Sequence, residues 1–232
     1  MTIKKLAAIL GLSHTTVSRA LNDHPAISQA TKDSVLQAAR DYGYIPNSAA
    51  RALRNASTGA FGLVIPDIQN DFFITVTNAI AHVAAERSWQ MMLGITSDKP
   101  EMEHAALLRL MTARVDGIIF APTANPLAET QELITRTNAV QLLRKHRSLQ
   151  APVIAIDDRH GISLAVKHLR ELGHQRIGYI GSSEELSTGY ERLQGFLQCF
   201  TPAEQTALQA LIHVGPCLLY TSPSPRDRSL SR

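Results

Sequence analysis

The chain of 232 residues is long enough for more than one domain, and its two cysteines, Cys199 and Cys217, are too few for a disulfide framework. The residues are 44% hydrophobic, but no apolar run approaches the roughly 18–20 residues that span a bilayer and no export signal follows Met1, so we expect a cytoplasmic protein with no membrane role. The net charge of +3 is uneven: residues 1–55 hold seven Lys or Arg against three Asp, whereas residues 56–216 carry a net charge of −3, which favours phosphate attraction by a basic amino-terminal module.

Three short helices are predicted within the first 45 residues. Thr2 suits the N-cap position of a helix from Ile3 to about Leu10, whose apolar residues recur at helical spacing, and Gly11 ends this helix. Ser13 can cap a second helix that runs through Leu21. Ser28 can cap a third helix, which Gly43 ends. Two short helices that meet at a glycine turn predict a helix-turn-helix.

The second of these helices is the candidate for reading DNA. Its inward face is predicted to hold Val17, Ala20 and Leu21, and its outward face His14, Thr15, Ser18 and Arg19. The core face of the third helix is predicted to hold Val35, Leu36 and Ala39. Arginine and small polar side chains near the N-terminus of such a helix are suited to contact base edges in the major groove.

The motifs Thr2-Ile3, Ala7–Ser13, Thr16–Asn22 and Gly43–Asn47 closely resemble the headpiece of the lac-repressor-like (LacI/GalR) family, and the match continues through Leu53. The resemblance implies that His14, Thr15 and Arg19 reach base edges, while other polar side chains hold the phosphate backbone. The predicted DNA-binding residues are Thr2, Ser13, His14, Thr15, Thr16, Ser18, Arg19, Asn22, Tyr44, Asn47, Ala50 and Leu53. The partner is then double-stranded operator DNA, bound by a homodimer.

Residues 46–57 are predicted to form a short hinge helix and a linker. Pro46 suits the start of a helix, but a helix of about nine residues is marginal alone in water. The resemblance implies that two copies pair in the minor groove, with Ala49 and Ala50 allowing close approach and Leu53 wedged between base steps. The alternative is an ordinary helical linker with Leu53 packed on the headpiece.

Apolar stretches alternate with helical segments through the rest of the chain, which predicts a parallel doubly wound sheet. The predicted strands are Phe61–Pro66, Gln90–Thr96, Gly117–Ala121, Ala139–Leu143, Val153–Asp157 and Ile177–Gly181. Segments such as Gly62–Asp67 and Leu172–Ile180 resemble the same family's effector domain, whose fold is like that of a periplasmic sugar-binding protein. The fold class is therefore an all-α headpiece at 1–45, an α/β first lobe at 58–157 and an incomplete second lobe at 158–216.

Ligands of such sheets bind at the carboxyl ends of the strands, and the resemblance implies a small-molecule effector in the cleft between the lobes. The predicted effector-binding residues are Asp67, Phe72, Phe73 and Arg192. An aromatic ring can stack on a sugar or base, and the arginine fork suits hydroxyls or a carboxylate. The alternative for Asp67, Phe72 and Phe73 is a capped helix with core aromatics.

A basic cluster follows the fourth predicted strand, at Arg144–Arg147, where many sugar-responsive members of the family carry an acid. Two interpretations stay open. The cluster could attract an anionic effector, such as a phosphorylated or carboxylated sugar, or it could be a solvated loop.

The last segment, residues 217–232, carries no hydrophobic period and no likeness to the family. It resembles the translation of a transposase-end sequencing adapter, so we expect a non-native tail and a natural protein that is truncated near Pro216. The alternative is a genuine disordered tail rich in Ser, Pro and Arg.

The sequence therefore predicts a transcriptional repressor whose operator binding is controlled by an effector, such as a sugar or a related metabolite. A stand-alone solute-binding protein would explain the body but not the headpiece. An enzyme is disfavoured because the chain has no glycine-rich phosphate loop, no G-x-S-x-G elbow and no metal-spaced His or Cys cluster. We expect no catalytic residues, no cofactor and no metal.

Overall fold

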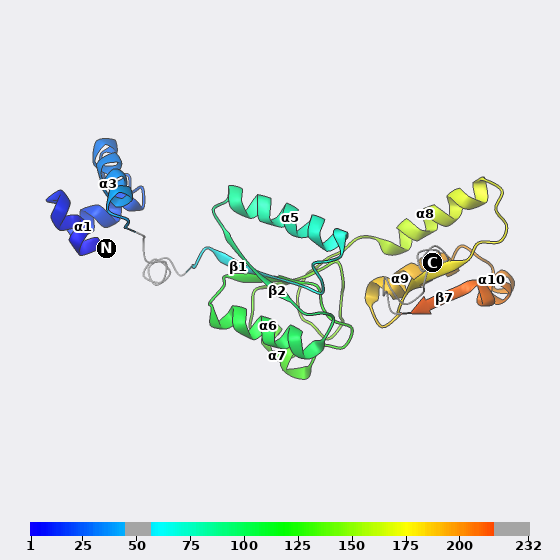
Figure 1. The fold of residues 1–232 in the computed structure, drawn as a ribbon. Helices are drawn as coiled ribbons and strands as arrows, with labels where there is room; N and C mark the ends of the chain where they lie inside the picture. The colour runs from blue at the N-terminus through cyan, green and yellow to red at the C-terminus, as the bar shows by residue number, and fades with distance from the viewer. Residues whose placement is uncertain (45–56, 216–232) are drawn as a thin grey trace, which may run out of the picture. The chain divides into compact units, whose positions relative to one another are not determined.

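The computed structural model describes residues 1–44 and 57–215 (Figure 1). The chain divides into two compact units, with the boundary in the sequence between Thr58 and Gly59. The predicted hinge residues Asn47, Ala50 and Leu53 and the predicted non-native tail lie outside the described residues. None of the described helices is both long and apolar enough to cross a membrane.

The amino-terminal unit, called the headpiece below, contains the three predicted helices, α1 (Ile3–Leu10), α2 (His14–Leu21) and α3 (Gln29–Asp41). The three predicted N-caps are confirmed by hydrogen bonds. Thr2 Oγ1 accepts from Lys5 N at 3.3 Å, Ser13 Oγ from Thr16 N at 3.0 Å and Ser28 Oγ from Thr31 N at 3.3 Å. Each such cap stabilises its helix by about 1 kcal/mol, and Gly11 ends α1 in the left-handed conformation that glycine tolerates.

The headpiece core forms where the three helices meet. Leu6, Val17 and Val35 are fully buried there, together with alanines from each helix. Leu36 does not join them, so its prediction as a core residue is wrong: its side chain is 41% exposed, and Ala38 is buried instead. Val35, Ala38 and Ala39 share one face at i, i+3 and i+4, whereas Leu36 is rotated by about 100° from Val35.

The second unit begins with a five-stranded sheet, which defines the first lobe (residues 59–157). Its strands are β1 (Ala60–Ile65), β2 (Gln90–Ile95), β3 (Gly117–Phe120), β4 (Ala139–Leu142) and β5 (Val153–Ile154). All neighbours are parallel, in the order β2-β1-β3-β4-β5. This confirms the five strands predicted here and the parallel sheet, although β5 is shorter than expected.

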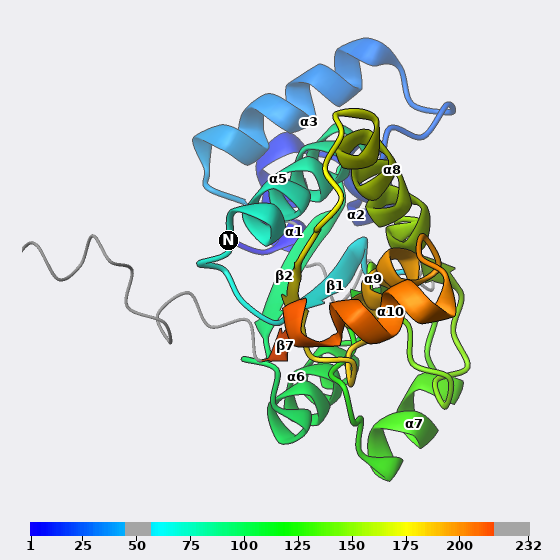
Figure 2. The same cartoon turned by 90° about the vertical axis from the view of Figure 1, so that its right-hand side faces the viewer.

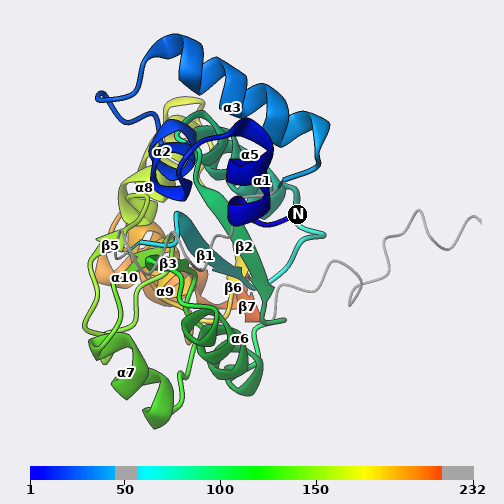
Figure 3. The same ribbon diagram turned by 90° about the vertical axis from the view of Figure 1, so that its left-hand side faces the viewer.

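Helices cover both faces of this sheet (Figures 1 and 3). Helix α5 (Asp71–Glu86) lies on one face, and α6 (Pro100–Thr112) and α7 (Ala128–Thr135) lie on the other. Strand side chains alternate between two cores accordingly. Leu63 and Ile65 pack with Phe73 of α5, whereas Val64 and Phe120 pack with Leu107 of α6. Because all the strands are parallel, their carboxyl ends and the loops that follow them lie at one edge of the sheet.

The second lobe comprises residues 158–215 (Figure 2). Its elements are α8 (Asp158–Glu171), β6 (Tyr179–Ser182), α9 (Ser187–Leu197), α10 (Pro202–Leu208), a 3-10 turn (Gln209–Leu211) and β7 (Ile212–Gly215). Strands β6 and β7 pair in parallel over a core that includes Phe196 and Leu193. The predicted strand at Ile177–Gly181 is confirmed as β6. Strand β7 was not predicted.

The two-stranded sheet exposes apolar side chains to solvent: Ile180 of β6 is 86% exposed and Val214 of β7 is 37% exposed. Apolar surface on a short sheet favours association between chains. We expect Ile180→Ser to lower the self-association of the chain, measured by sedimentation across a concentration series, whereas Ile180→Val should leave it unchanged. Identical sedimentation of wild type and Ile180→Ser would contradict this role for the exposed strand.

Candidate functional site

Helix α2 presents polar side chains on the surface of the headpiece. His14, Thr15 and Arg19 are exposed, and Thr15 and Arg19 lie one turn apart on the same face. The loop that joins α2 to α3 is fixed by an ion pair of 2.6 Å between Asp23 and Lys32. The guanidinium of Arg19, the imidazole of His14 and the hydroxyl of Thr15 are therefore presented together by α2, as contact with base edges requires.

Ser18 differs from the expectation that it faces outward. Its side chain is only 7% exposed, and its carbonyl oxygen accepts a hydrogen bond of 2.6 Å from Asn22 Nδ2. Helix α2 packs on both α1 and α3, so its buried arc is wider than the sequence suggested and includes Ser18. Ser18 is therefore better placed to fix α2 in the headpiece than to contact DNA.

The residues predicted to contact the phosphate backbone lie at both ends of α2, at Ser13, Thr16 and Asn22, and near the end of the headpiece, at Tyr44, while Thr2 is a further predicted DNA-binding residue. Ser13 and Thr16 share a hydrogen bond of 2.8 Å between their hydroxyls, and the Thr2 hydroxyl caps α1. A hydroxyl that accepts a cap bond still has a proton to donate to a phosphate, provided that no neighbour accepts that proton. Asn22 is exposed, and Tyr44 is half-buried against the headpiece core. Their contacts with DNA remain predictions.

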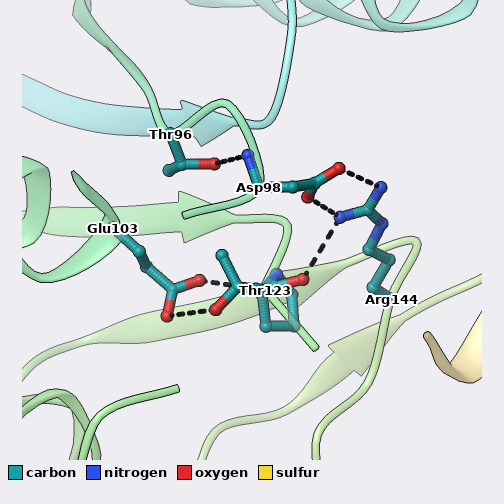
Figure 4. Close-up of polar contacts among 6 residues, drawn as sticks. Thr96, Asp98, Glu103, Thr123 and Arg144 are labelled. Atoms are coloured by element: carbon teal, nitrogen blue, oxygen red, sulfur yellow. Dashed lines mark hydrogen bonds and ion pairs between the residues drawn. The ribbon is translucent and has the colours of Figure 1, made fainter. Parts of the chain in front are cut away.

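A polar cluster joins the ends of three strands at the carboxyl edge of the first-lobe sheet (Figure 4). Arg144, which follows β4, forms an ion pair with Asp98, which follows β2, and its Nη1 lies 3.5 Å from the carbonyl oxygen of Pro122 after β3. The guanidinium carbon also lies 5.9 Å from the ring centre of Phe73. Arg144 thus ties three loops together beneath the edge where ligands of such sheets bind.

This arrangement corrects the interpretation of Arg144 as part of a solvated loop. The residue is only 9% exposed, and both terminal nitrogens donate to the Asp98 carboxylate. Because Asp98 neutralises the guanidinium, Arg144 is not available as a free charge for an anionic effector. Lys145 and Arg147, the other cationic residues of the cluster, are exposed.

Below this ion pair, a buried carboxylate fixes the loop after β3 (Figure 4). Glu103 of α6 is fully buried and accepts from Thr123 N at 2.6 Å and from Thr123 Oγ1 at 3.2 Å. Burial raises the pKa of the Glu103 carboxyl above its usual value of 4.5, against the opposing effects of Thr123 and Arg144.

A raised carboxyl pKa in the folded chain stabilises the fold most below the usual pKa, and this contribution is lost as the pH rises through the raised value. We expect the free energy of unfolding of wild type, relative to Glu103→Gln, to increase as the pH falls from 7 to about 4.5. Urea unfolding of both chains across this range measures the difference. A difference that does not change with pH, or changes in the opposite direction, would show that Glu103 does not titrate in this way.

The predicted effector-binding residues come from both lobes of the second unit. Asp67 is exposed and its Oδ1 accepts from Gln69 N at 2.7 Å; Phe72 is 47% exposed, whereas Phe73 is buried in the core beneath α5. Arg192 of α9 donates through Nε to Asp158 Oδ1 at 2.7 Å, and its side chain is about half exposed. Phe73 thus fits the core interpretation, and Phe72, Asp67 and Arg192 remain the accessible candidates.

Sequence reasoning did not identify Asp98, Glu103 or Thr123 as members of the site. The available signal was topological, because Asp98 and Thr123 each lie two residues after the end of a predicted strand and parallel strands end at one edge. Within residues 1–44 and 57–215, no group of three or more His, Cys, Asp or Glu side chains could hold a metal ion.

A hollow of about 880 Å³ lies at the opposite end of the sheet, beside the C-terminal half of α5. Its lining is mainly apolar and includes Ile80, Val83, Trp89, Ile119 and Val140. Because it adjoins Phe61 and Gly117 at the amino ends of β1 and β3, it is not the carboxyl-edge position at which such sheets bind effectors.

Two family models match the chain. The model of "bacterial regulatory proteins, lacI family" matches residues 2–47, and that of "periplasmic binding proteins and sugar binding domain of LacI family" matches residues 58–207. Among curated relatives, the chain is 32% identical over 215 residues to the HTH-type transcriptional regulator GalR of Salmonella typhimurium, and 33% identical over 195 residues to the ribose operon repressor of Halalkalibacterium halodurans. These alignments cover 92% and 84% of this chain, but only 63% and 58% of the relatives' own lengths.

Solved structures support the same fold. The lac repressor dimer bound to operator and the anti-inducer ONPF superposes with a TM-score of 0.77 at 23% identity, over 93% of this chain and 65% of that one. A periplasmic binding protein/LacI transcriptional regulator from Alkaliphilus metalliredigens, complexed with D-xylulofuranose, superposes with a TM-score of 0.57 at 26% identity, over 67% of this chain and 55% of that one.

Proposed function

Because the chain belongs to the lacI family of bacterial regulatory proteins, we propose that it is a transcriptional repressor whose binding to operator DNA is controlled by a small-molecule effector. The observation that carries this proposal is the exposed set of His14, Thr15 and Arg19 on α2, within a headpiece that matches the family's DNA-binding model. A stand-alone solute-binding protein would have no use for such a surface.

In this proposal, α2 enters the major groove and Arg19 donates to a guanine, while His14 and Thr15 set which operator is read. Ser13, Thr16 and Asn22, together with Tyr44, contact the phosphate backbone and fix the register. Two copies of the chain bind a pseudo-palindromic site, with the segment 46–57 pairing in the minor groove. The protein acts in the cytoplasm, and its role is binding rather than catalysis.

The effector is proposed to be an uncharged, hydroxyl-rich molecule such as a sugar. Two relatives support this class: one is a ribose operon repressor by name, and another was solved with D-xylulofuranose. Arg192 offers donors, and Asp67 offers an acceptor beside the exposed ring of Phe72. The neutralisation of Arg144 by Asp98 argues against an anionic effector, because it removes one buried positive charge from the carboxyl edge.

Selection of bound duplexes from a randomised library, using the full 232-residue chain at fixed salt, tests the DNA-binding part of this proposal. We expect enrichment of one pseudo-palindromic motif. Binding that is sequence-blind and only salt-dependent, or no binding, would contradict it. Ribose, galactose and their phosphates, added to the complex with the selected duplex, then test the effector class, and release by the phosphates alone would overturn the preference for uncharged sugars.

A further inference from the structure

Two polar contacts join the loop after β4 in the first lobe to α9 in the second lobe. Lys145 N donates to Ser187 Oγ at 2.9 Å, and Lys145 Nζ donates to Glu191 Oε1 at the same distance. Ser187 and Glu191 lie one turn apart on α9, so a single residue of the first lobe contacts one face of that helix. The two lobes are thereby linked at a defined point beside the carboxyl edge of the sheet.

The first-lobe side of this link is held rigidly. Gln141, at the core of β4, is almost fully buried, and its Nε2 donates to the carbonyl oxygens of Leu149 and Ala151 at 3.2 and 3.0 Å. Its Oε1 accepts from His146 N at 2.7 Å. Arg144, the residue before Lys145, is tied to Asp98. Lys145 therefore projects from a loop whose backbone is fixed on both sides.

On the second-lobe side, helix α9 is held against α8 by two ion pairs, in which each helix supplies one acid and one arginine. Asp158 pairs with Arg192 at 2.7 Å, and the next residue, Arg159, pairs with Glu191 at 2.8 Å. The helices are also in close contact at Gly195, where an added Cβ would lie 2.5 Å from the Arg159 carbonyl oxygen. Glu191 thus gives one carboxylate oxygen to Arg159 in its own lobe and the other to Lys145 across the gap.

We propose that the contacts of Lys145 with Glu191 and Ser187 form an interlobe latch that holds the two lobes in the arrangement seen here. The Glu191 side chain is 23% exposed, and its hydrogen bond with Lys145 holds the pKa of its carboxyl below the usual value, so this carboxyl is ionised at neutral pH. Glu191 directly precedes Arg192. If the proposed function is correct, an effector that displaces Arg192 from Asp158 would therefore disturb the helix that carries the latch.

The latch can be tested without DNA or effector, so its failure would leave the proposed function untouched. In a Cys199→Ser, Cys217→Ser background of the full chain, Glu132→Cys on α7 and Lys167→Cys on α8 place spin labels at exposed positions on the two lobes. The distance distribution between the labels reports the arrangement of the lobes. Lys145→Met removes the ammonium group that pairs with Glu191 across the lobes. Ser187→Ala removes the hydroxyl that accepts from Lys145 N and leaves every charge in place.

Arg159→Met is the matched control, because it removes a cation from the same Glu191 carboxylate but leaves the interlobe pair intact. We expect Lys145→Met to increase the ratio of rearranged to native-like distances about two- to fivefold, Ser187→Ala to shift it in the same direction, and Arg159→Met to shift it less. Raising the salt concentration should move wild type toward Lys145→Met. Unchanged distributions in both latch variants, or an equal shift in Arg159→Met, would overturn the proposal.

Discussion

Replacing Arg19 with alanine is expected to lower the affinity of the chain for its selected operator by about 10- to 100-fold per half-site. A bidentate contact between arginine and guanine contributes roughly 1–3 kcal/mol of discrimination, and alanine keeps the helix while removing the fork. Affinity for unrelated DNA should fall much less, since only one of several positive charges is lost. Fluorescence anisotropy with the selected duplex and a scrambled duplex measures both affinities.

Arg40→Ala provides a control of equal charge. Arg40 lies near the end of α3, where its guanidinium donates to Gln37 Oε1 at 2.8 Å within the same helix. This variant should lower the affinity of the chain for both duplexes slightly and to the same extent. If Arg19→Ala and Arg40→Ala had the same effect on the two duplexes, Arg19 would be acting only as a general positive charge, and the assignment of α2 as the reading helix would fail.

The second large effect is a loss of stability expected from Asp98→Ala. This substitution removes the carboxylate that pairs with the Arg144 guanidinium, which is almost fully buried. Breaking a buried ion pair by removing one partner costs about 3–5 kcal/mol, and the partial exposure of Asp98 lowers the expectation here to about 2–4 kcal/mol. Urea unfolding monitored by circular dichroism measures this loss of stability.

A second substitution distinguishes an unpaired charge from a general packing defect. Asp98→Ala combined with Arg144→Met should be more stable than Asp98→Ala alone, because the double variant leaves no buried charge without a partner. A double variant that is less stable than the single variant would indicate that the Arg144 contacts with Pro122 and Phe73, rather than its charge pairing, dominate. A loss below about 0.5 kcal/mol in Asp98→Ala would mean that the ion pair contributes little.

Most of the secondary structure was predicted correctly because helix caps and apolar strands depend on residues that are close together in the sequence. The hydroxyls of Thr2, Ser13 and Ser28 cap the helices that they precede, and the apolar strands lie in a sheet covered on both faces. Strand β7 was missed because the segment Ile212–Gly215 has only two apolar residues, separated by His213, and therefore lacks the apolar run that marked the other strands. Its identity as a strand depends on pairing with β6, more than thirty residues earlier.

The errors at the candidate sites have the same origin. Arg144 looked like part of a basic loop, because its partner Asp98 lies 46 positions away in the sequence and becomes a neighbour only when β2 and β4 lie in one sheet. Ser18 looked exposed because one helix face was assumed, whereas α2 has two neighbours. Phe72 and Phe73 were indistinguishable in the sequence, and only the packing of α5 separates the exposed ring from the buried one.

The most direct test of sequence-specific recognition is a parallel selection from one randomised duplex library with wild type and with a His14→Ala, Thr15→Ala variant. Both substituted positions are exposed and neither is part of the headpiece core, so the variant should fold. We predict that each chain enriches a palindromic motif, and that the two motifs differ at a few positions while sharing the guanine assigned to Arg19. Two identical motifs, or no enrichment by wild type, would contradict the assignment of α2 as the helix that reads the operator.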